Sequence, residues 1–197
     1  MRRAIYGGSF NPIHNDHVKL ALQFAEQFSL DKVTLIPTNI TPLKDNSHIV
    51  SGAHRYQMCL LATEDYPQLE VSDIELRREG ESYTSDTIAA LKNENDSLFL
   101  IVGADMYMTL DRWHEFRYIF DNATILVAPR DELGYDSLKE KYEEYKANYG
   151  CRTLIFHQPI GELSSTVIRE GIKFDTDVSH MIDSRVLKYI QEHDLYR

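Results

Sequence analysis

The chain has 197 residues, of which 43% are hydrophobic and 26% charged, and its formal net charge is -10. This length suits one α/β domain with a single sizeable core, so we predict one domain over residues 1–197. The negative charge disfavours general nucleic-acid binding, which needs clustered Lys and Arg. No apolar run approaches the roughly 20 residues of a membrane helix, and no signal-peptide stretch develops after Met1. We therefore expect no membrane partner and a cytoplasmic location.

Short apolar segments rich in β-branched residues recur along the chain and predict strands that are buried on both faces of a parallel sheet. These segments are residues 4–6, 33–36, 98–102, 124–128 and 153–156. Between them, apolar residues at helical spacing predict helices within 18–28, 56–63 and 88–92. The alternation of strands and helices predicts a doubly wound, Rossmann-like α/β fold with helices on both faces of the sheet.

Two further helices are predicted towards the C-terminus. Residues 135–149 form a charged pattern with a stripe of Tyr and Leu, which favours a solvated surface helix. Residues 183–197 predict a small C-terminal helical segment, capped by Asp183 or Ser184. The longest predicted loop, residues 37–54, is rich in Pro, Asn, Ser and Thr, and loops of that length are usually functional or disordered.

Aromatic and sulfur-containing residues give weaker signals. Residues 111–120, DRWHEFRYIF, place three aromatic side chains on one helical stripe, which by itself predicts core packing. These side chains are Trp113, Phe116 and Phe120. Cys59 and Cys151 have no metal-ligand spacing and suggest no disulfide framework.

The stretch AIYGGSFNPIHNDHV, residues 4–18, has the pattern of a strand, a glycine turn and a helix that begins near Asn15 or Asp16. Such a turn presents free backbone N–H groups and the positive end of the helix dipole at the carboxyl edge of the sheet, where they suit a phosphate. Gly7 and Gly8 would let the backbone approach a ligand closely. The fingerprints of dinucleotide-binding turns and P-loops are both missing from this sequence.

His14 and His17 are the distinctive part of this stretch, because residues three apart share one face of a helical turn. Both imidazoles could serve as donors to one phosphate during phosphoryl or nucleotidyl transfer. The alternative is that His14 caps the turn while His17 packs or is solvated. A metal site that includes Asp16 is less favoured, since Asp16 lies roughly 200° around a regular helix from His14.

Two other stretches could contact a nucleotide. Residues 164–166 supply three hydroxyl groups that open a predicted helix, with Arg169 one turn further on, so this cap could bind a triphosphate from the other side. An ordinary Ser/Thr cap is the alternative. In FLIVGADM, residues 99–106, Asp105 follows the end of an apolar strand, where its carboxylate could accept from ribose hydroxyls or cap a helix.

Together these motifs resemble the nucleotidyltransferase superfamily with its H-x-G-H signature and, within it, the nicotinate-nucleotide adenylyltransferase family. The family pattern G-G-[ST]-F-[DN]-P-x-H-x-G-H is similar to residues 7–17, and the pattern S-x-T-x-I-R is similar to residues 164–169. Between them, several segments follow the family's order: Pro37-Thr38-Asn39, Pro42, Lys44, residues 82–87, residues 102–105 and Trp113. The resemblance covers nearly the whole chain.

The resemblance implies a single nucleotidyltransferase domain, and it implies transfer of the adenylyl group of ATP to nicotinate mononucleotide. The products would be nicotinate adenine dinucleotide and pyrophosphate. The mononucleotide phosphate would attack the α-phosphorus in line, with Mg²⁺ carried by ATP and pyrophosphate oxygens rather than by protein ligands. ATP and nicotinate mononucleotide are therefore the expected partners, while self-association is left open.

The resemblance also implies roles for individual residues. The expected ATP-binding residues are Gly7, Gly8, Ser9, Phe10, His14, His17, Gly103, Asp105, Arg130, Ser164, Thr166 and Arg169. The expected mononucleotide-binding residues are Asn39, Lys44, Tyr83, Thr84, Trp113 and His114, with Trp113 stacked on the pyridine ring. The residues expected to act in catalysis are His14, His17, Lys44 and Arg169.

The chain departs from the family pattern at three positions. Asn11 stands where members often carry Asp, Leu43 stands where His often precedes the loop Lys, and Asp16 replaces the Gly between the histidines. A carboxylate at position 16 could crowd the nucleotide and oppose its phosphates, or it could be an ordinary first-turn acid that the helix dipole favours by about 0.3 kcal/mol.

Two alternative functions remain open at this point. One is a sister adenylyltransferase of the phosphopantetheine type or a cytidylyltransferase, although such chains generally lack the Ser-Tyr-Thr segment and Trp113. The other is a catalytically weakened sensor that binds nucleotide without turnover, which Asp16 alone favours.

Overall fold

The computed structural model describes residues 1–40, 49–129, 134–156, 161 and 163–197. Its centre is a parallel sheet of six strands in the order β3-β2-β1-β4-β5-β6. The strands are β1 (Arg2–Gly8), β2 (Lys32–Pro37), β3 (Leu69–Val71), β4 (Ser97–Gly103), β5 (Thr124–Ala128) and β6 (Thr153–Ile155). The strand order reverses between β1 and β4, and doubly wound folds bind ligands at the carboxyl ends of strands at such a switch point.

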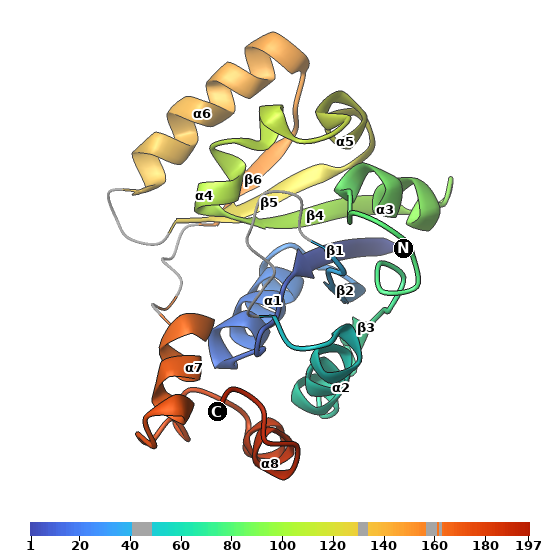
Figure 1. Cartoon of the computed structure of the whole chain (residues 1–197). Helices are drawn as coiled ribbons and strands as arrows, with labels where there is room; N and C mark the ends of the chain where they lie inside the picture. Colours follow the sequence, from blue (N-terminus) through green and yellow to red (C-terminus); the bar gives the residue numbers. More distant parts are fainter. Residues whose placement is uncertain (41–48, 130–133, 157–160, 162) are drawn as a thin grey trace.

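Helices cover both faces of the sheet, as predicted. They are α1 (Asn15–Gln27), α2 (Gly52–Thr63), α3 (Thr84–Leu91), α4 (Ala104–Tyr107), α5 (Phe116–Asn122), α6 (Gly134–Tyr149), α7 (Ser165–Lys173) and α8 (Ser184–Glu192), with a 3-10 helix at Leu110–Arg112. Figure 1 shows α1, α2, α7 and α8 on one side and α3 to α6 on the other. Successive residues of β1 alternate accordingly, because Ala4 and Tyr6 belong to one hydrophobic cluster and Ile5 to the other.

Strand β3 was not predicted from the sequence. It has three residues, and only Leu69 among them is buried. So short a segment shows no clear alternation, and its pairing with β2 at the edge of the sheet is a tertiary contact.

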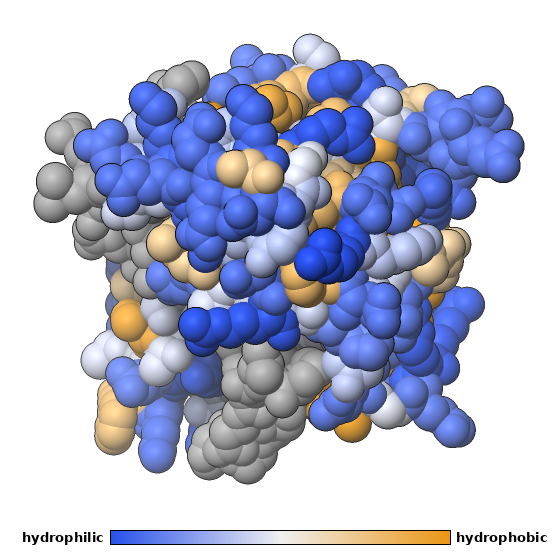
Figure 2. Space-filling view, turned by 90° about the horizontal axis from the view of Figure 1, so that it is seen from above, coloured by the Kyte–Doolittle hydropathy of each residue, from blue (hydrophilic) through white to orange (hydrophobic). Residues whose placement is uncertain are grey.

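Helix α6 is a surface helix, but its Tyr and Leu stripe attaches it firmly to the sheet. Leu138 and Tyr145 are buried in the cluster beneath it, and the Tyr145 hydroxyl donates to the Tyr107 carbonyl oxygen at 3.0 Å. Figure 2 looks onto this side of the molecule and shows mostly hydrophilic residues, with hydrophobic ones scattered among them. The prediction of a solvated helix therefore holds for its outer face only.

The prediction of one helical stripe over residues 111–120 is wrong. The 3-10 helix ends at Arg112, Glu115 has left-handed backbone angles (φ 50°, ψ 39°), and α5 begins only at Phe116. Because a left-handed residue interrupts a right-handed helix, Trp113 lies in the connection and does not share a helical face with Phe116 and Phe120. Phe120 is buried as predicted.

Three smaller predictions can also be compared with the structure. Asp183 is the cap of α8, because its side chain accepts from the Arg185 N–H at 2.8 Å. The predicted 37–54 loop ends earlier than expected, since α2 begins at Gly52, and its residues 41–48 lie outside the described part of the chain. Cys59 and Cys151 are buried free thiols. Within the described ranges, no helix is long and apolar enough to cross a membrane.

Candidate active site

The loop between β1 and α1 lies at the switch point of the sheet. A Cβ atom added to Gly7 would meet no described atom within 4 Å, so open space adjoins the backbone there. A Cβ on Gly8 would instead lie 3.0 Å from the Phe10 ring. Gly7 thus leaves room for a ligand, whereas a side chain at Gly8 would press on the Phe10 ring, and Phe10 itself has a left-handed φ of 46°.

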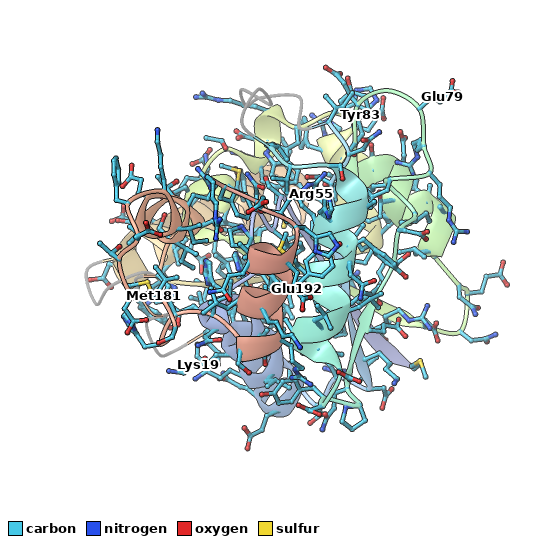
Figure 3. The ribbon with its side chains drawn as sticks, turned by 60° about the horizontal axis from the view of Figure 1, so that its bottom comes forward. Lys19, Arg55, Glu79, Tyr83, Met181 and Glu192 are labelled. Atoms are coloured by element: carbon cyan, nitrogen blue, oxygen red, sulfur yellow. The ribbon has the colours of Figure 1, made fainter. Side chains whose placement is uncertain are left out.

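Arg55 of α2 connects this loop to two other segments of the chain, and the sequence analysis did not identify it. Its side chain is 2% exposed and donates to the carbonyl oxygens of Val50 (3.0 Å), Ser9 (2.8 Å) and Thr38 (2.6 Å). In Figure 3, Arg55 lies at the upper end of α2, and Tyr83 lies farther out beside the segment before α3. The sequence did contain a signal for its burial: Arg55 lies one helical turn before Cys59, so the two residues share the buried face of α2.

His14 and His17 face each other at the start of α1. His14 is the N-cap residue, and its backbone N–H donates to Nδ1 of His17 at 3.2 Å. The two rings stack with their centroids 3.6 Å apart and an interplanar angle of 26°. Because Nδ1 of His17 accepts a hydrogen bond, the neutral ring carries its proton on Nε2.

Both histidines are held in the neutral form. Burial lowers the pKa of His14 to about 4, although the Asp16 charge acts in the opposite direction. Burial and the neighbouring His14 hold the pKa of His17 well below its ordinary value. At neutral pH each ring therefore offers an uncharged N–H donor rather than a positive charge. Nδ1 of His14 is buried and has no partner among the described residues.

The start of α7 contacts the same loop from the other side. Ser165 Oγ donates to the Pro12 carbonyl oxygen (2.8 Å), and Nη1 of Arg169 donates to the Asn11 carbonyl oxygen (2.9 Å). The Ser164 side chain accepts from the Thr166 N–H at 3.2 Å, so it is also an ordinary helix cap. The structure brings the two predicted phosphate motifs together, while their roles in binding stay predictions.

Asp16 takes part in this junction. Its Oδ2 atom accepts a hydrogen bond from the Leu163 N–H at 2.9 Å. The carboxylate is therefore not a free acid at the start of α1, because it links this helix to the segment that leads into α7.

Of the remaining residues expected at ATP, the structure describes two. Gly103 ends β4, next to β1 in the sheet, and a Cβ there would meet no described atom within 4 Å. Asp105 is exposed in the first turn of α4. Both lie at the carboxyl edge of the sheet, whereas Lys44 and Arg130 lie outside the described residues.

The residues expected at the mononucleotide form a second group. The Tyr83 and His114 rings lie 4.2 Å apart between centroids, and Thr84 begins α3 directly after Tyr83. The Asn39 backbone N–H donates to Ser82 Oγ at 2.9 Å, which brings the end of β2 to the same segment. Trp113 is half-buried beside His114.

Several buried polar atoms around this second group have no partner among the described residues. They include Nε1 of Trp113 and Oγ of Ser85. Glu75 is 4% exposed and accepts from Thr87 Oγ1 at 2.7 Å. Burial raises its pKa, while hydrogen bonds from Thr87 and Ser82 act in the opposite direction. The sequence analysis missed Glu75, because it lies in a strongly charged stretch that reads as solvated.

Comparison with known proteins first establishes the class. Residues 5–171 match the cytidylyltransferase-like family, so the chain is a nucleotidyltransferase by class, and its parallel sheet has the corresponding fold. A protein of Lachnoclostridium phytofermentans is 32% identical over 98% of this chain and 97% of its own length. A protein of Flavobacterium psychrophilum is 35% identical over 100% of both chains. Both are described as probable nicotinate-nucleotide adenylyltransferases. The chain belongs to this nicotinate-nucleotide adenylyltransferase family, as the motifs indicated.

Solved structures share the fold. The Plasmodium falciparum nicotinic acid mononucleotide adenylyltransferase complexed with NaAD superimposes with a TM-score of 0.81, covering 99% of this chain and 97% of that one. The two sequences are 17% identical, so this likeness concerns the fold alone.

Proposed function

We propose that the His14–His17 pair and the start of α7 hold the phosphates of ATP while this enzyme transfers the adenylyl group to nicotinate mononucleotide. The products are nicotinate adenine dinucleotide and pyrophosphate. The observation that carries the proposal is the stacked histidine pair at the N-terminus of α1, together with the hydrogen bond by which Arg169 of α7 reaches Asn11 in the β1–α1 loop. Backbone N–H groups and the dipole at a helix start favour phosphate binding.

The chemistry needs positioned donors more than a strong base. The attacking phosphate of the mononucleotide is already ionised at neutral pH, and in-line displacement at phosphorus depends on alignment and on charge stabilisation. Neutral histidine N–H groups suit this role. Arg169 uses two donors on Asn11 and Thr166 and has others left for a phosphate oxygen. Lys44 and Arg130 are proposed here on the resemblance alone.

The second group of residues would bind the mononucleotide. We propose that Trp113 stacks on the pyridine ring, with Asn39, Tyr83, Thr84 and His114 around it. The unpartnered Nε1 of Trp113 supports this proposal, since an unsatisfied buried polar group costs about 1–3 kcal/mol and a ligand or water could satisfy it.

Mg²⁺ would enter with ATP. This ion keeps several waters and usually binds through one or two carboxylates and substrate phosphates. The proposed ligands are therefore phosphate oxygens of ATP and of pyrophosphate. The Mg²⁺ would neutralise charge that develops on the pyrophosphate. We further propose that residues 1–197 act as one domain; the cytoplasmic location, the expected lack of nucleic-acid and membrane partners, and the oligomeric state stay predictions.

The test is pyrophosphate release by the purified enzyme with MgATP and a panel of acceptors: nicotinate mononucleotide, nicotinamide mononucleotide and phosphopantetheine. We expect the highest kcat/KM with nicotinate mononucleotide. Release with phosphopantetheine alone, or with CTP in place of ATP, would support a sister transferase. If no acceptor gives pyrophosphate release but the protein still binds ATP, the result would support a sensor.

A further inference from the structure

Asp16 and Gly161 fit each other across the junction between α1 and the segment before α7. Asp16 Oδ2 accepts from the Leu163 N–H at 2.9 Å. A Cβ atom added to Gly161 would lie 2.7 Å from both Cγ and Oδ1 of Asp16, a separation that real Cβ atoms essentially never show. The carboxylate thus occupies the space that any side chain at position 161 would need.

We propose that Asp16 and Gly161 form a matched clasp that fixes the first turn of α7 against the histidine pair, so that Asp16 is a positioning residue for the ATP phosphates. This inference rests on the proposed function of the same site. The glycine expected at position 16 from the family pattern has no side chain that could make this contact, so the clasp distinguishes this chain from that pattern.

The clasp acts where the chain approaches the predicted phosphate motif. Two other hydrogen bonds join α7 to the β1–α1 loop, from Ser165 to Pro12 and from Arg169 to Asn11, and both have backbone carbonyl acceptors. The contacts made by Asp16 and by Arg169 each include a charged group, and such hydrogen bonds are stronger than the neutral one from Ser165. It also holds the residue immediately before the Ser164 cap.

The charge of Asp16 has an opposing effect that an experiment can separate. A carboxylate close to the histidines would repel the phosphates of ATP, and its removal by itself would tighten ATP binding. Loss of the clasp would weaken ATP binding. Asp16→Asn removes the charge but keeps an oxygen that can accept from the Leu163 N–H, whereas Asp16→Ala removes both.

The experiment measures KM and kcat for both substrates, and the dissociation constant of ATP, in four variants: Asp16→Asn, Asp16→Ala, Gly161→Ala and the double variant Asp16→Ala/Gly161→Ala. We expect Asp16→Ala to raise the KM for ATP about tenfold, the loss of one hydrogen bond to a charged group, with kcat and the mononucleotide KM nearly unchanged. Asp16→Asn should fall between the wild type and Asp16→Ala, because it keeps the acceptor oxygen but loses the charge that strengthens the hydrogen bond. Gly161→Ala should resemble Asp16→Ala, because the added methyl group displaces the carboxylate.

The double variant tests whether Asp16 and Gly161 act together. If the two residues form one clasp, Gly161→Ala causes no further loss once Asp16 is Ala, so the two effects are not additive. Additive effects would overturn the clasp. Tighter ATP binding in both Asp16→Asn and Asp16→Ala would also overturn it, since Asp16 would then act only as a repelling charge.

Asp136→Ala is the matched control, because Asp136 is an exposed first-turn acid of α6. It should leave both KM values unchanged, and thermal unfolding of every variant checks folding. If the wild-type enzyme releases no pyrophosphate, the proposed function fails, and the ATP dissociation constants of the same variants still decide whether the clasp exists.

Discussion

In the β1–α1 loop, backbone carbonyl oxygens accept hydrogen bonds from side chains of α2 and α7, which are distant in the sequence. Around Tyr83, by contrast, the contacts include a pair of side-chain rings. Arg55 of α2 holds Ser9, and Arg169 of α7 holds Asn11. The Tyr83 ring lies 4.2 Å, between centroids, from the exposed ring of His114. The proposed phosphate half of the site is therefore fixed by side chains of two helices, while the proposed pyridine half also depends on a contact between two rings, one of them exposed.

This difference teaches how the two halves can divide their work. Donors held on a rigid frame stabilise charge in the transition state with little reorganisation, and their loss lowers kcat. A stacking side chain at the rim adds affinity for the bound ring, and its loss raises KM. Loss of a proposed phosphate donor such as His17 should therefore lower kcat, whereas loss of the stacking ring of Trp113 should raise the KM for the mononucleotide.

The largest effect is expected at His17. His17→Ala removes a neutral N–H donor that we propose binds the ATP phosphates, and loss of one such donor costs about 100-fold to 1000-fold in kcat, or about 3–4 kcal/mol. Steady-state pyrophosphate release measures it, with thermal unfolding as the check on folding. Near-normal turnover would show that His17 is not part of the proposed site. The two halves would then not differ in their effects on kcat and KM.

The next effect concerns stability and pH. The pKa of His14 is about 4 in the folded chain and near its ordinary 6.5 when unfolded. Between these values the unfolded chain binds more protons, so the free energy of unfolding falls as pH is lowered from about 7 to 4. A shift of this size corresponds to about 3 kcal/mol.

Urea denaturation of the wild type and His14→Gln at pH 7 and pH 4.5 measures this contribution. The variant should lose less stability than the wild type on acidification. Buried His17 contributes with the same sign and Glu75 with the opposite sign, and both are present in the two proteins, so the difference reports His14 together with its effect on His17. Equal losses in the two proteins would mean that His14 is not held neutral by burial.

The smallest effect is expected at Trp113. Trp113→Ala should raise the KM for nicotinate mononucleotide about tenfold, since stacking on a base is worth about 1–3 kcal/mol. The KM for ATP should not change, and Trp113→Phe should recover most of the loss because it keeps an aromatic face. An equal rise in both KM values would show that Trp113 supports the site as a whole rather than the ring.

Much of the fold could be predicted because its signals are local. Apolar runs marked five of the strands, and helical spacing marked α1, α2 and α3. The errors fall where local patterns mislead. β3 is three residues long at a sheet edge, and the left-handed Glu115 separates Trp113 from the helix that its spacing suggested.

The site was predictable to a similar extent. His14 and His17 share a face because they are three residues apart on one helix, which spacing alone shows. Arg55 and Glu75 were missed, because a charged side chain is normally exposed and only the packing around it reveals that it is buried. Their hydrogen-bond partners lie on other elements or in other loops.

The sequence by itself determined most of the strand and helix pattern, the glycine turn after the first strand, the spacing of the two histidines and the family. These features follow from the types and spacing of residues that are close along the chain, so they can be recognised in the sequence. The tertiary structure alone decided that Asp16 meets Leu163, 147 residues away, and that Gly161 leaves room for its carboxylate. Such contacts depend on how helices dock on the sheet, which the spacing of residues along the chain does not encode.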